Sequence, residues 1–567
     1  MYTYTEFDKH FVHQRAAQYR DQLQRNLAGQ LGDDEFRALR LQNGWYIQRH
    51  APMLRVAVPY GELNSTQMRA LARIAREFDR GYGHFTTRQN LQYNWIALTQ
   101  SADVMDALAA VNMHGIQTSG NCIRNITSDC FAGVAADEIV DPRPYCEILR
   151  QWSTLHPEFA FLPRKFKIAV TGAREDRAAI AWHDIGLQLL KNEAGEVGFK
   201  VLVGGGMGRT PIIGTVVRQF LPWQQILVFI EAVVRVYNRY GRRDNMYKAR
   251  IKILVKAEGQ KFIDDVNEEF RNILERDLDG SAHLITQAEF DRVAANFRLP
   301  AGVVPQAGKA DPLHVPADAP LAFRRWIERN VHPHQLNGYR AVTLSLKRAG
   351  QAPGDATDTQ MDLAADLADR YSAGELRVSH DQNLVLPWVR EADLPALYEA
   401  AKAASFATPN IGHLTDMIAC PGGDFCGLAN ARSIPIAAAI NERFDDLDEL
   451  YDIGDIDLHI SGCINSCGHH HSGHIGILGV DKDGSEWYQV TLGGSDGSAL
   501  AETAATGKVI GPSFAADEVP DVIEAVIDTY RHQRAANERF IDTVKRVGID
   551  AFKAAANAQR RSTAQAA

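Results

Sequence analysis

Two stretches in the last third of the chain, Ala419–Gly427 (ACPGGDFCG) and Ser461–Gly468 (SGCINSCG), are the most informative part of the sequence. Each holds a pair of cysteines, spaced C-x5-C and C-x3-C, and glycines border both pairs. Glycine lets the backbone turn sharply and approach a bulky group. Because four thiolates are the usual ligands of a [4Fe-4S] cluster, we expect such a cluster here. A zinc site, for which C-x5-C is a long spacing, and unligated or disulfide-bonded cysteines are the alternatives. The four candidate ligands are Cys420, Cys426, Cys463 and Cys467.

Three further cysteines, Cys122, Cys130 and Cys146, bring the total to seven. We expect Cys130 and Cys146 to be buried small apolar residues. The chain opens on a polar, mixed segment that lacks the pattern of a signal peptide, and no apolar run comes near the roughly 18 residues of a membrane span. We therefore expect a cytoplasmic protein with reduced thiols and no membrane partner.

Length and charge narrow the class of protein. The chain has 567 residues, which predicts three or four domains. The formal net charge is -9, and no basic tail or run of Lys and Arg stands out. Nucleic acid is therefore not an expected partner. A Pro-rich stretch over residues 300–320 is typical of an inter-domain linker.

The second half of the chain repeats the first with an offset of 293 residues. Two shorter matches, FKIAVTG with DLHISG and FKVLVGGG with YQVTLGGS, have offsets of 290 and 289. A shared offset over so long a stretch predicts a duplication, spanning roughly 51–265 and 344–558. The matches at 293 are TQM at 66–68 with 359–361, QNL at 89–91 with 382–384, and IEAV at 230–233 with 523–526.

Both copies predict the same elements. A strand (MLRVAVP; YRAVTLSL) precedes a helix that begins at TQM, and then a second strand (NLQYNWIAL; NLVLPWV) precedes a second helix (VMDALAAV; LPALYEAAKAA). Two more strands and a long amphipathic helix containing IEAV complete the copy. The pattern indicates an internally duplicated α+β fold with a pseudo-twofold axis. We expect a ligand site where the two halves meet.

The two copies differ in chemistry. Only the second copy has the cysteine pairs, whereas candidate cationic side chains concentrate in the first. Arg88 of TTRQNLQ aligns with Asp381 of SHDQNLV. Any one of these cations could be a solvated surface residue. Together they favour a redox enzyme that acts on an anion. The cations of the first copy are Arg55, Arg88, Arg124, Arg164, Lys165, Lys167, Arg250 and Lys252.

From about Tyr46 to its end, the chain resembles the sulfite and nitrite reductase hemoproteins, which couple a siroheme to a [4Fe-4S] cluster, and among them the assimilatory sulfite reductase hemoprotein. The motifs that carry the resemblance are MLRVAVP, TTRQNLQ, GNCIRN, LPRKFK, VGGGMGRTP, ACPGGDFCG and SGCINSCG. It implies ferredoxin-like half-domains plus two α/β domains that bind siroheme and cluster. The implied divisions are an N-terminal arm (1–50), a first half-domain (51–135), a first siroheme-binding domain (146–299), a linker (300–334), a second half-domain (335–410) and a cluster-bearing domain (416–567).

The resemblance also implies roles for single residues. Cys467 would be a cluster ligand that also bridges to the siroheme iron. His84 stands where the family has an arginine, so one contact to a siroheme carboxylate is expected to be weaker or pH-sensitive. The implied substrate-binding cations are Arg55, Arg124, Lys165 and Lys167. The residues implied on the siroheme side are Arg88, Gln92, Arg164, Arg250 and Lys252.

The implied activity is the assimilatory six-electron reduction of sulfite to sulfide. Nitrite reduction to ammonia on the same scaffold is the alternative, and a non-catalytic iron–sulfur redox sensor or scaffold is a more distant one. Lys165-Phe166-Lys167 favours sulfite, since nitrite reductases of the family tend to have Lys-x-Asn. GGGMG at 204–208 lacks the spacing of a dinucleotide site, so a separate ferredoxin or flavoprotein must supply electrons.

A run of histidines, His469 to His471, follows Cys467 directly. We expect a loop near the cofactors with histidines at the surface. A second metal site, or one histidine in a proton path, is the alternative interpretation.

Overall fold

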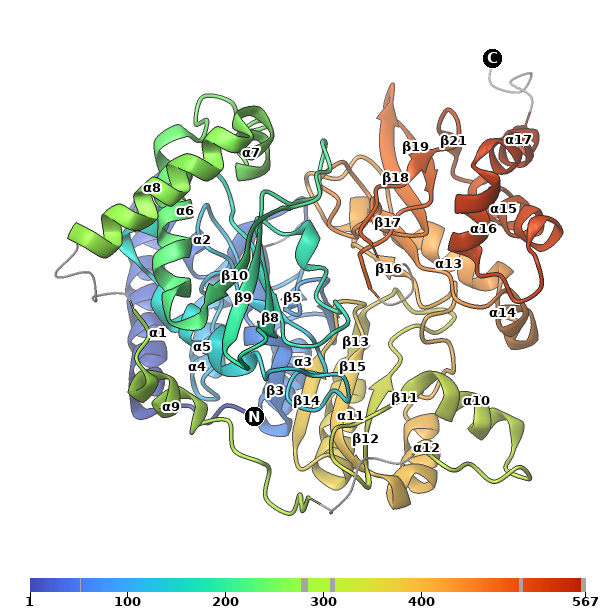
Figure 1. Ribbon diagram of the computed structural model, residues 1–567, viewed down its shortest axis with the longest axis horizontal. Coiled ribbons are helices and arrows are strands. Elements are labelled where there is room, and N and C mark those ends of the chain that lie inside the picture. The colour runs from blue at the N-terminus through green and yellow to red at the C-terminus, as the bar shows by residue number, and fades with distance from the viewer. Residues whose placement is uncertain (51, 277–283, 306–311, 499–502, 562–567) are drawn as a thin grey trace.

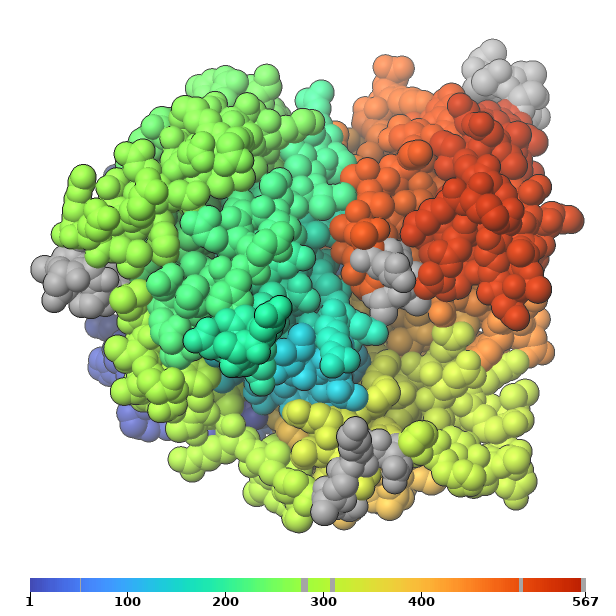
Figure 2. Space-filling view, in the orientation of Figure 1, coloured from blue at the N-terminus to red at the C-terminus, as the bar shows by residue number. Residues whose placement is uncertain are grey.

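The computed structural model of the chain describes residues 1–50, 52–276, 284–305, 312–498 and 503–561 (Figure 1). Two lobes, green and orange to red in the figure, stand side by side; the yellow half-domain lies below them and the blue one lies largely behind the green lobe. Figure 2 shows the same two lobes in contact along one face. Trp182 of the first lobe donates to the Ser495 carbonyl of the second at 3.1 Å.

The predicted N-terminal arm contains two helices, α1 (Glu6–Leu27) and α2 (Asp33–Gln42). Thr5 caps α1, because its hydroxyl accepts the backbone N–H of Asp8 and the Asp8 carboxylate accepts that of Thr5. The helix packs on the first half-domain through Tyr19, whose hydroxyl lies 2.9 Å from that of Ser101.

Each half-domain is built on a five-stranded sheet, and the two sheets exchange one strand. Strand β13, from the second copy, pairs with β4 of the first sheet, and β3, from the first copy, pairs with β14 of the second. The halves therefore cannot separate without breaking both sheets. The first sheet has the order β1 (Trp45–Ile47), β2 (Pro52–Val56), β5 (Leu91–Tyr93), β4 (Tyr82–Phe85) and β13 (Asp355–Thr357). The second has the order β11 (Val331–His332), β12 (Tyr339–Leu344), β15 (Leu384–Arg390), β14 (Glu375–Val378) and β3 (Glu62–Asn64).

The recurring TQM begins a helix in both copies, for a local reason. Gln67 and Gln360 are the third residues of α3 (Ser65–Phe78) and α11 (Asp358–Tyr371), and each side chain accepts the backbone N–H of the N-cap residue at 3.1 and 3.0 Å. The motif is thus the second half of a capping box. The two helices pack against each other. The remaining half-domain helices are α4 (Ser101–Ala109), α10 (Leu321–Asn330) and α12 (Leu394–Ala403).

Each lobe is a second sheet covered by helices. In both, the first three strands run parallel to one another and the following strands are antiparallel. The first sheet comprises β6 (Thr127–Ser128), β7 (Ile168–Thr171), β8 (Ile185–Lys191), β9 (Val197–Val203) and β10 (Thr215–Pro222). The second comprises β16 (Ile418–Ala419), β17 (Leu458–Ser461), β18 (Ile475–Lys482), β19 (Ser485–Leu492), β20 (Lys508–Val509) and β21 (Phe514–Ala515).

The helices of the lobes bury an apolar core on each sheet. Those of the first lobe are α5 (Arg143–Ser153), α6 (Ile226–Tyr240), α7 (Ile251–Glu258), α8 (Gln260–Arg276) and α9 (Gln287–Ala294). Those of the second are α13 (Ile434–Arg443), α14 (Leu447–Ile453), α15 (Val519–Gln533), α16 (Phe540–Val547) and α17 (Asp550–Ala558). None of the described helices combines the length and apolar character needed to cross a membrane.

The predicted duplicated α+β fold is confirmed, with differences in detail. The simple strand–helix–strand–helix order omits β3 and β4 in the first half-domain and β13 and β14 in the second. The strand predicted at NLQYNWIAL is shorter than expected, since β5 ends at Tyr93. The predicted linker contains α10 and β11. Cys130 and Cys146 are buried, as expected.

Candidate active site

The two cysteine stretches lie together because they leave the same edge of one sheet. Cys420 follows β16 and Cys463 lies just after β17, and these two strands are parallel neighbours. The Cys420 sulfur accepts the backbone N–H of Gly462 at 3.2 Å, and the Cys420 N–H donates to the Ile460 carbonyl at 3.2 Å. Backbone hydrogen bonds thus fix the distance between the two pairs.

Glycine is required beside both pairs on steric grounds. A Cβ atom at Gly468 would lie 1.9 Å from the Ile460 carbonyl oxygen, and one at Gly462 would lie 2.5 Å from that of Ala431. Contacts this short cannot form without moving the backbone. The glycines therefore let the cysteine loops fold tightly, which was predicted from the sequence.

The four thiols form one electrostatic group. Burial raises the pKa of Cys420, and the negative charge of Cys467 raises it further. Burial also raises the pKa of Cys463, with added repulsion from Cys467 and Cys426. Among the residues that the structure describes, no three His, Cys, Asp or Glu side chains are placed to hold a single metal ion. Cys467 is the exposed member of the quartet.

Lys165 and Lys167 come just before β7 of the first lobe, close enough to Cys467 for its charge to act on both. Neither amino group forms a hydrogen bond or ion pair with any part of the chain that the structure describes. Burial lowers the pKa of both lysines. Repulsion from Arg124 lowers the pKa of Lys165 further, and repulsion from Arg88 lowers the pKa of Lys167 further. Within the described part of the chain, two amino groups without partners thus lie near the cysteine quartet.

Arg55 and Arg124 converge on one backbone carbonyl next to these lysines. Arg55 is the cross-strand partner of Gln92, and its guanidinium donates to the Gln92 side-chain oxygen at 3.2 Å and to the Thr118 carbonyl at 3.3 Å. Arg124 donates to the same carbonyl at 2.6 Å and to that of Gly120. Both guanidiniums are thereby oriented by carbonyl and amide oxygens, and neither pairs with a carboxylate among the residues that the structure describes.

The other residues predicted on the siroheme side differ in the hydrogen bonds and ion pairs that they already form within the described chain. Arg88 donates to the Asn125 carbonyl at 2.6 Å and lacks an anionic partner among the described residues. The Arg164 side chain makes no hydrogen bond within the described ranges. Arg250, in contrast, forms an ion pair with buried Asp184 at 2.7 Å.

Lys252 is already engaged with the backbone. Its amino group donates to three carbonyls of the glycine loop, those of Gly206, Met207 and Thr210, at 3.2, 2.7 and 2.6 Å. Burial, followed by repulsion from Arg250, lowers the pKa of Lys252 to about 7. Lys252 therefore holds the loop in place, and a direct contact to a carboxylate would need one of these bonds to give way.

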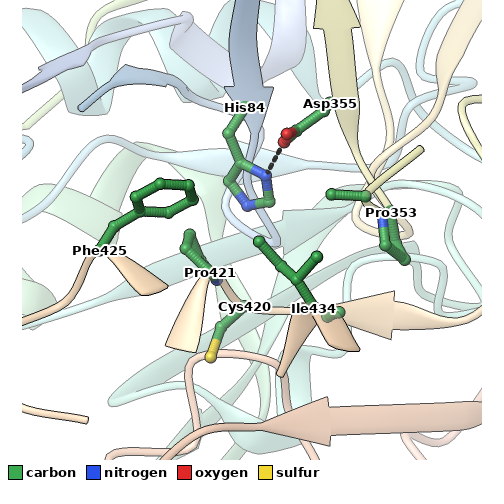
Figure 3. A pocket seen from close by; sticks show the side chains of 9 residues that line it. His84, Pro353, Asp355, Cys420, Pro421, Phe425 and Ile434 are labelled. Carbon is green, nitrogen blue, oxygen red and sulfur yellow. Dashed lines mark hydrogen bonds and ion pairs between the residues drawn. The ribbon is translucent and has the colours of Figure 1, made fainter. Parts of the chain in front are cut away.

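His84 is not free to contact a siroheme carboxylate in the way its sequence position suggested. Its Nδ1 lies 2.7 Å from the Asp355 carboxylate of the exchanged strand β13 (Figure 3). Its Nε2 lies 3.1 Å from the Gln382 side-chain nitrogen. The ring is 5% exposed and lines a small pocket behind Cys420. His84 thus joins the two copies beside the cluster loop.

The prediction that the histidine run lies at the surface is wrong. His469 and His470 are buried, and His471 reaches across the lobe interface to the Gly208 carbonyl at 2.9 Å. Burial lowers the pKa of all three residues. These neutral rings form part of the packing between the lobes.

Three residues of the site escaped the sequence analysis. Asp184 accepts the Lys167 backbone N–H at 2.9 Å while it pairs with Arg250. Thr87 donates to the Cys467 carbonyl at 2.9 Å. Burial would raise the pKa of Tyr46, but Arg124 and Arg55 outweigh it and lower the pKa to about 8. Asp184 and Tyr46 lie outside the repeated and cysteine-bearing motifs, and Thr87 lies inside TTRQNLQ but its contact with the Cys467 loop appears only in the folded chain.

The fold thus brings the four cysteines of the second copy close to lysine and arginine side chains of the first, an arrangement that suits a redox enzyme acting on an anion. The chain belongs to the nitrite and sulphite reductase family: the model of the family's 4Fe-4S domain matches residues 119–274 and 413–563. The model of its ferredoxin-like half domain matches residues 46–111 and 333–404. The chain is thus an oxidoreductase, and its cofactors are siroheme and a [4Fe-4S] cluster, as predicted.

Similar proteins carry both substrate names. The chain is 29% identical to the assimilatory ferredoxin-dependent nitrite reductase of Haloferax mediterranei, over 88% of this chain and 82% of that protein. It is 28% identical to sulfite reductase [ferredoxin] 1 of Mycolicibacterium paratuberculosis, over 86% and 81%. The solved structure of the Mycobacterium tuberculosis NirA protein matches with a TM-score of 0.75 and 26% identity, covering 94% of each chain.

Proposed function

We propose that this enzyme reduces sulfite to sulfide with six electrons and releases the three oxygens as water. The observation that supports this most is the pair of unpartnered amino groups on Lys165 and Lys167, placed where the charge of Cys467 reaches both. Two free cations suit an anion that is partly dianionic near neutral pH. When bound, the siroheme and cluster supply the electrons to the substrate.

The cations have two tasks in this proposal. Arg55 and Arg124, held by the Thr118 carbonyl, orient the anion through charge-assisted hydrogen bonds. Lys165 and Lys167 donate protons to the departing oxygens. Because burial lowers the pKa of both ammonium groups, each is a stronger acid than an exposed lysine and gives up its proton more readily.

Binding of the cofactors uses the remaining residues. The four cysteines would hold the cluster, and Cys467, the exposed one, would bridge to the siroheme iron. Siroheme carries several carboxylates, and burial of these requires donors. Those we propose for its carboxylates and for that side of the ring are Arg88, Gln92, Arg164, Arg250 and Lys252.

Nitrite reduction to ammonia is the second candidate, because relatives that are as similar as the sulfite reductases are named nitrite reductases. The Lys-x-Lys sequence at 165–167 is our reason to prefer sulfite. The test is the ratio of kcat/KM for sulfite and nitrite, with methyl viologen as reductant. We expect Lys167→Asn to shift this ratio toward nitrite, since the loss of one cation weakens binding of the more highly charged anion. An unchanged ratio would remove the reason for preferring sulfite.

We further propose that a ferredoxin supplies the electrons in an assimilatory, cytoplasmic role, since the similar nitrite and sulfite reductases are named as ferredoxin enzymes. A flavoprotein donor is the alternative. A visible spectrum of the purified protein distinguishes both from a non-catalytic iron–sulfur sensor, because siroheme absorbs strongly and a cluster alone absorbs weakly and broadly.

A further inference from the structure

An open groove lies on the outer face of the loop that carries the first cysteine pair. We call it the Trp95 groove; it has a volume of about 640 Å³ and is lined by His50, Arg80, Trp95, Asp424, Phe425 and Ile434. Phe425 immediately precedes Cys426 in the sequence. Phe425 and Ile434 also line the small pocket that contains Cys420 (Figure 3). Two side chains thus separate the floor of the groove from a cluster ligand.

The groove has a fixed aromatic wall. Trp95 packs edge-to-face on Phe425, with ring centroids 5.4 Å apart. Its indole N–H donates to the Tyr82 hydroxyl at 2.9 Å, and its backbone N–H donates to Asp79 at 2.9 Å. An indole held from two sides is a rigid surface that loses little entropy when a partner binds.

The basic side chains at this wall are exposed. The Arg80 guanidinium lies 3.5 Å from the Trp95 ring centroid, and the His50 ring stacks on the same indole at 5.8 Å. Arg49, also exposed, donates to the Gly423 carbonyl of the cluster loop at 3.3 Å. Asp424 is the acidic side chain of the lining.

The groove and its rim carry a small positive excess, because Arg80 and neighbouring Arg49 outnumber Asp424, whereas the molecule as a whole is negative. The chain has a formal net charge of -9, so an acidic protein is repelled by most of its surface. A cationic, aromatic-walled groove attracts such a protein to one place. Aromatic residues and arginine are also the side chains most enriched where proteins bind each other.

We propose that the Trp95 groove is the docking surface for the electron donor, a small acidic protein that carries one electron. This rests on the proposed function, since a reductase without its own flavin needs such a donor. At each docking the donor is oxidised by one electron and the cluster is reduced by one, so a six-electron reduction takes six dockings. The wall of Trp95 and Phe425 lets the donor approach the cluster loop closely, which electron transfer requires.

The test uses the holoenzyme, a reduced plant-type [2Fe-2S] ferredoxin and the variant Arg80→Glu. We expect the KM for ferredoxin to rise about tenfold or more at low ionic strength, because a like charge then faces the donor. Turnover with methyl viologen, which needs no docking surface, is expected to stay at the wild-type rate. The wild-type KM should rise with salt, and that of the variant should respond less.

Arg370→Glu is the matched control. Arg370 is exposed and lies over the Tyr371 ring at 5.1 Å, so it resembles Arg80 in setting. Ion pairs of Arg69 with Asp366 and of Arg76 with Asp358 show that helices α3 and α11 run antiparallel. Arg80 follows the end of α3 and Arg370 lies at the end of α11. The two arginines are therefore at opposite ends of this helix pair. We expect no change in the ferredoxin KM for this variant.

A second variant, His50→Asp, tests the groove from its other side and should also raise the ferredoxin KM. An unchanged KM in both groove variants overturns the proposal, as does an equal loss of rate with ferredoxin and methyl viologen. Turnover with NADPH alone would also overturn it. If wild-type enzyme reduces neither anion with methyl viologen, the proposed function fails instead, and calorimetric titration of ferredoxin still decides the docking surface.

Discussion

Lys167 shows how the site sets the properties of a single residue. Asp184 holds its backbone N–H, so the carboxylate fixes the position of the lysine without neutralising its amino group. The same carboxylate is paired with Arg250. Among the described residues the amino group has no ion-pair partner, and burial, followed by repulsion from Arg88, lowers its pKa. A free, acidic ammonium suits both anion binding and proton donation.

Lys165→Ala is expected to lower the reduction rate far more than the siroheme content. Loss of one charge-assisted contact to a reacting anion costs ~2–4 kcal/mol of transition-state stabilisation. The measurement is turnover with methyl viologen per bound siroheme, with siroheme quantified from the visible spectrum. Loss of siroheme with normal turnover per siroheme would instead place Lys165 among the residues that hold the cofactor.

At the scale of elements, the exchanged strands connect the two copies through buried charge. Arg377 of β14 is 1% exposed and pairs with Glu375 at 2.7 Å and with Glu62 of β3 at 3.4 Å. Arg143 of the first lobe pairs with the same Glu62 at 2.9 Å. Each arginine neutralises the charge of buried carboxylates, so removal of any one member would leave another buried charge without a partner.

Arg377→Met is therefore expected to destabilise the protein by about 3–5 kcal/mol, since it leaves two buried carboxylates short of a partner. Thermal unfolding followed by circular dichroism measures the loss. The matched control is Arg69→Met, because exposed Arg69 links α3 to Asp366 and Asp369 of α11 across the same interface. A surface pair of this kind contributes about 0–1 kcal/mol. Equal effects of the two substitutions would contradict a special role for the buried network.

The sequence predicted these elements unevenly, for physical reasons. The helices at TQM and the amphipathic IEAV helices were predictable because capping and a 3.6-residue period are local properties. The cysteine loops were predictable because glycine and thiol spacing is local too. The exchange of β3 and β13 was not, since it depends on which edge of a sheet is free after the two copies meet. Asp184 and Tyr46 were missed because only tertiary contacts define their role.

At the scale of the whole molecule, the duplication places residues of opposite charge at corresponding positions of the two copies. Strands β7 and β17 have the same register, since Ile168 pairs with Ile185 and Leu458 with Ile475, so Lys167 corresponds to Asp457. Arg88 likewise corresponds to Asp381. In the proposed function the cationic copy holds the anion and the carboxylate-rich cofactor. The charge difference would then restrict a duplicated fold to one anion site.

The acidic copy is expected to make stability depend on pH. Burial, followed by repulsion from Asp416, raises the pKa of Asp381 to about 7, although the side chain still reaches solvent, which screens the effect. A carboxyl group with a raised pKa in the folded state binds more protons folded than unfolded. Its contribution to stability is therefore full below the unfolded pKa near 4 and is lost as the pH rises through 7.

Asp381→Asn removes this titration, so the variant should gain stability relative to wild type as the pH rises from 5 to 8. The measurement is the difference in unfolding temperature between variant and wild type at the two pH values, with cofactor content matched. Asp366→Asn is the control, because Asp366 is an exposed carboxylate paired with Arg69 at 2.6 Å on the helix surface and should not gain stability at pH 8. If the difference in unfolding temperature between Asp381→Asn and wild type were the same at both pH values, the raised pKa of Asp381 would be wrong. The opposite charges of the two copies would then affect ligand binding but not the pH dependence of stability.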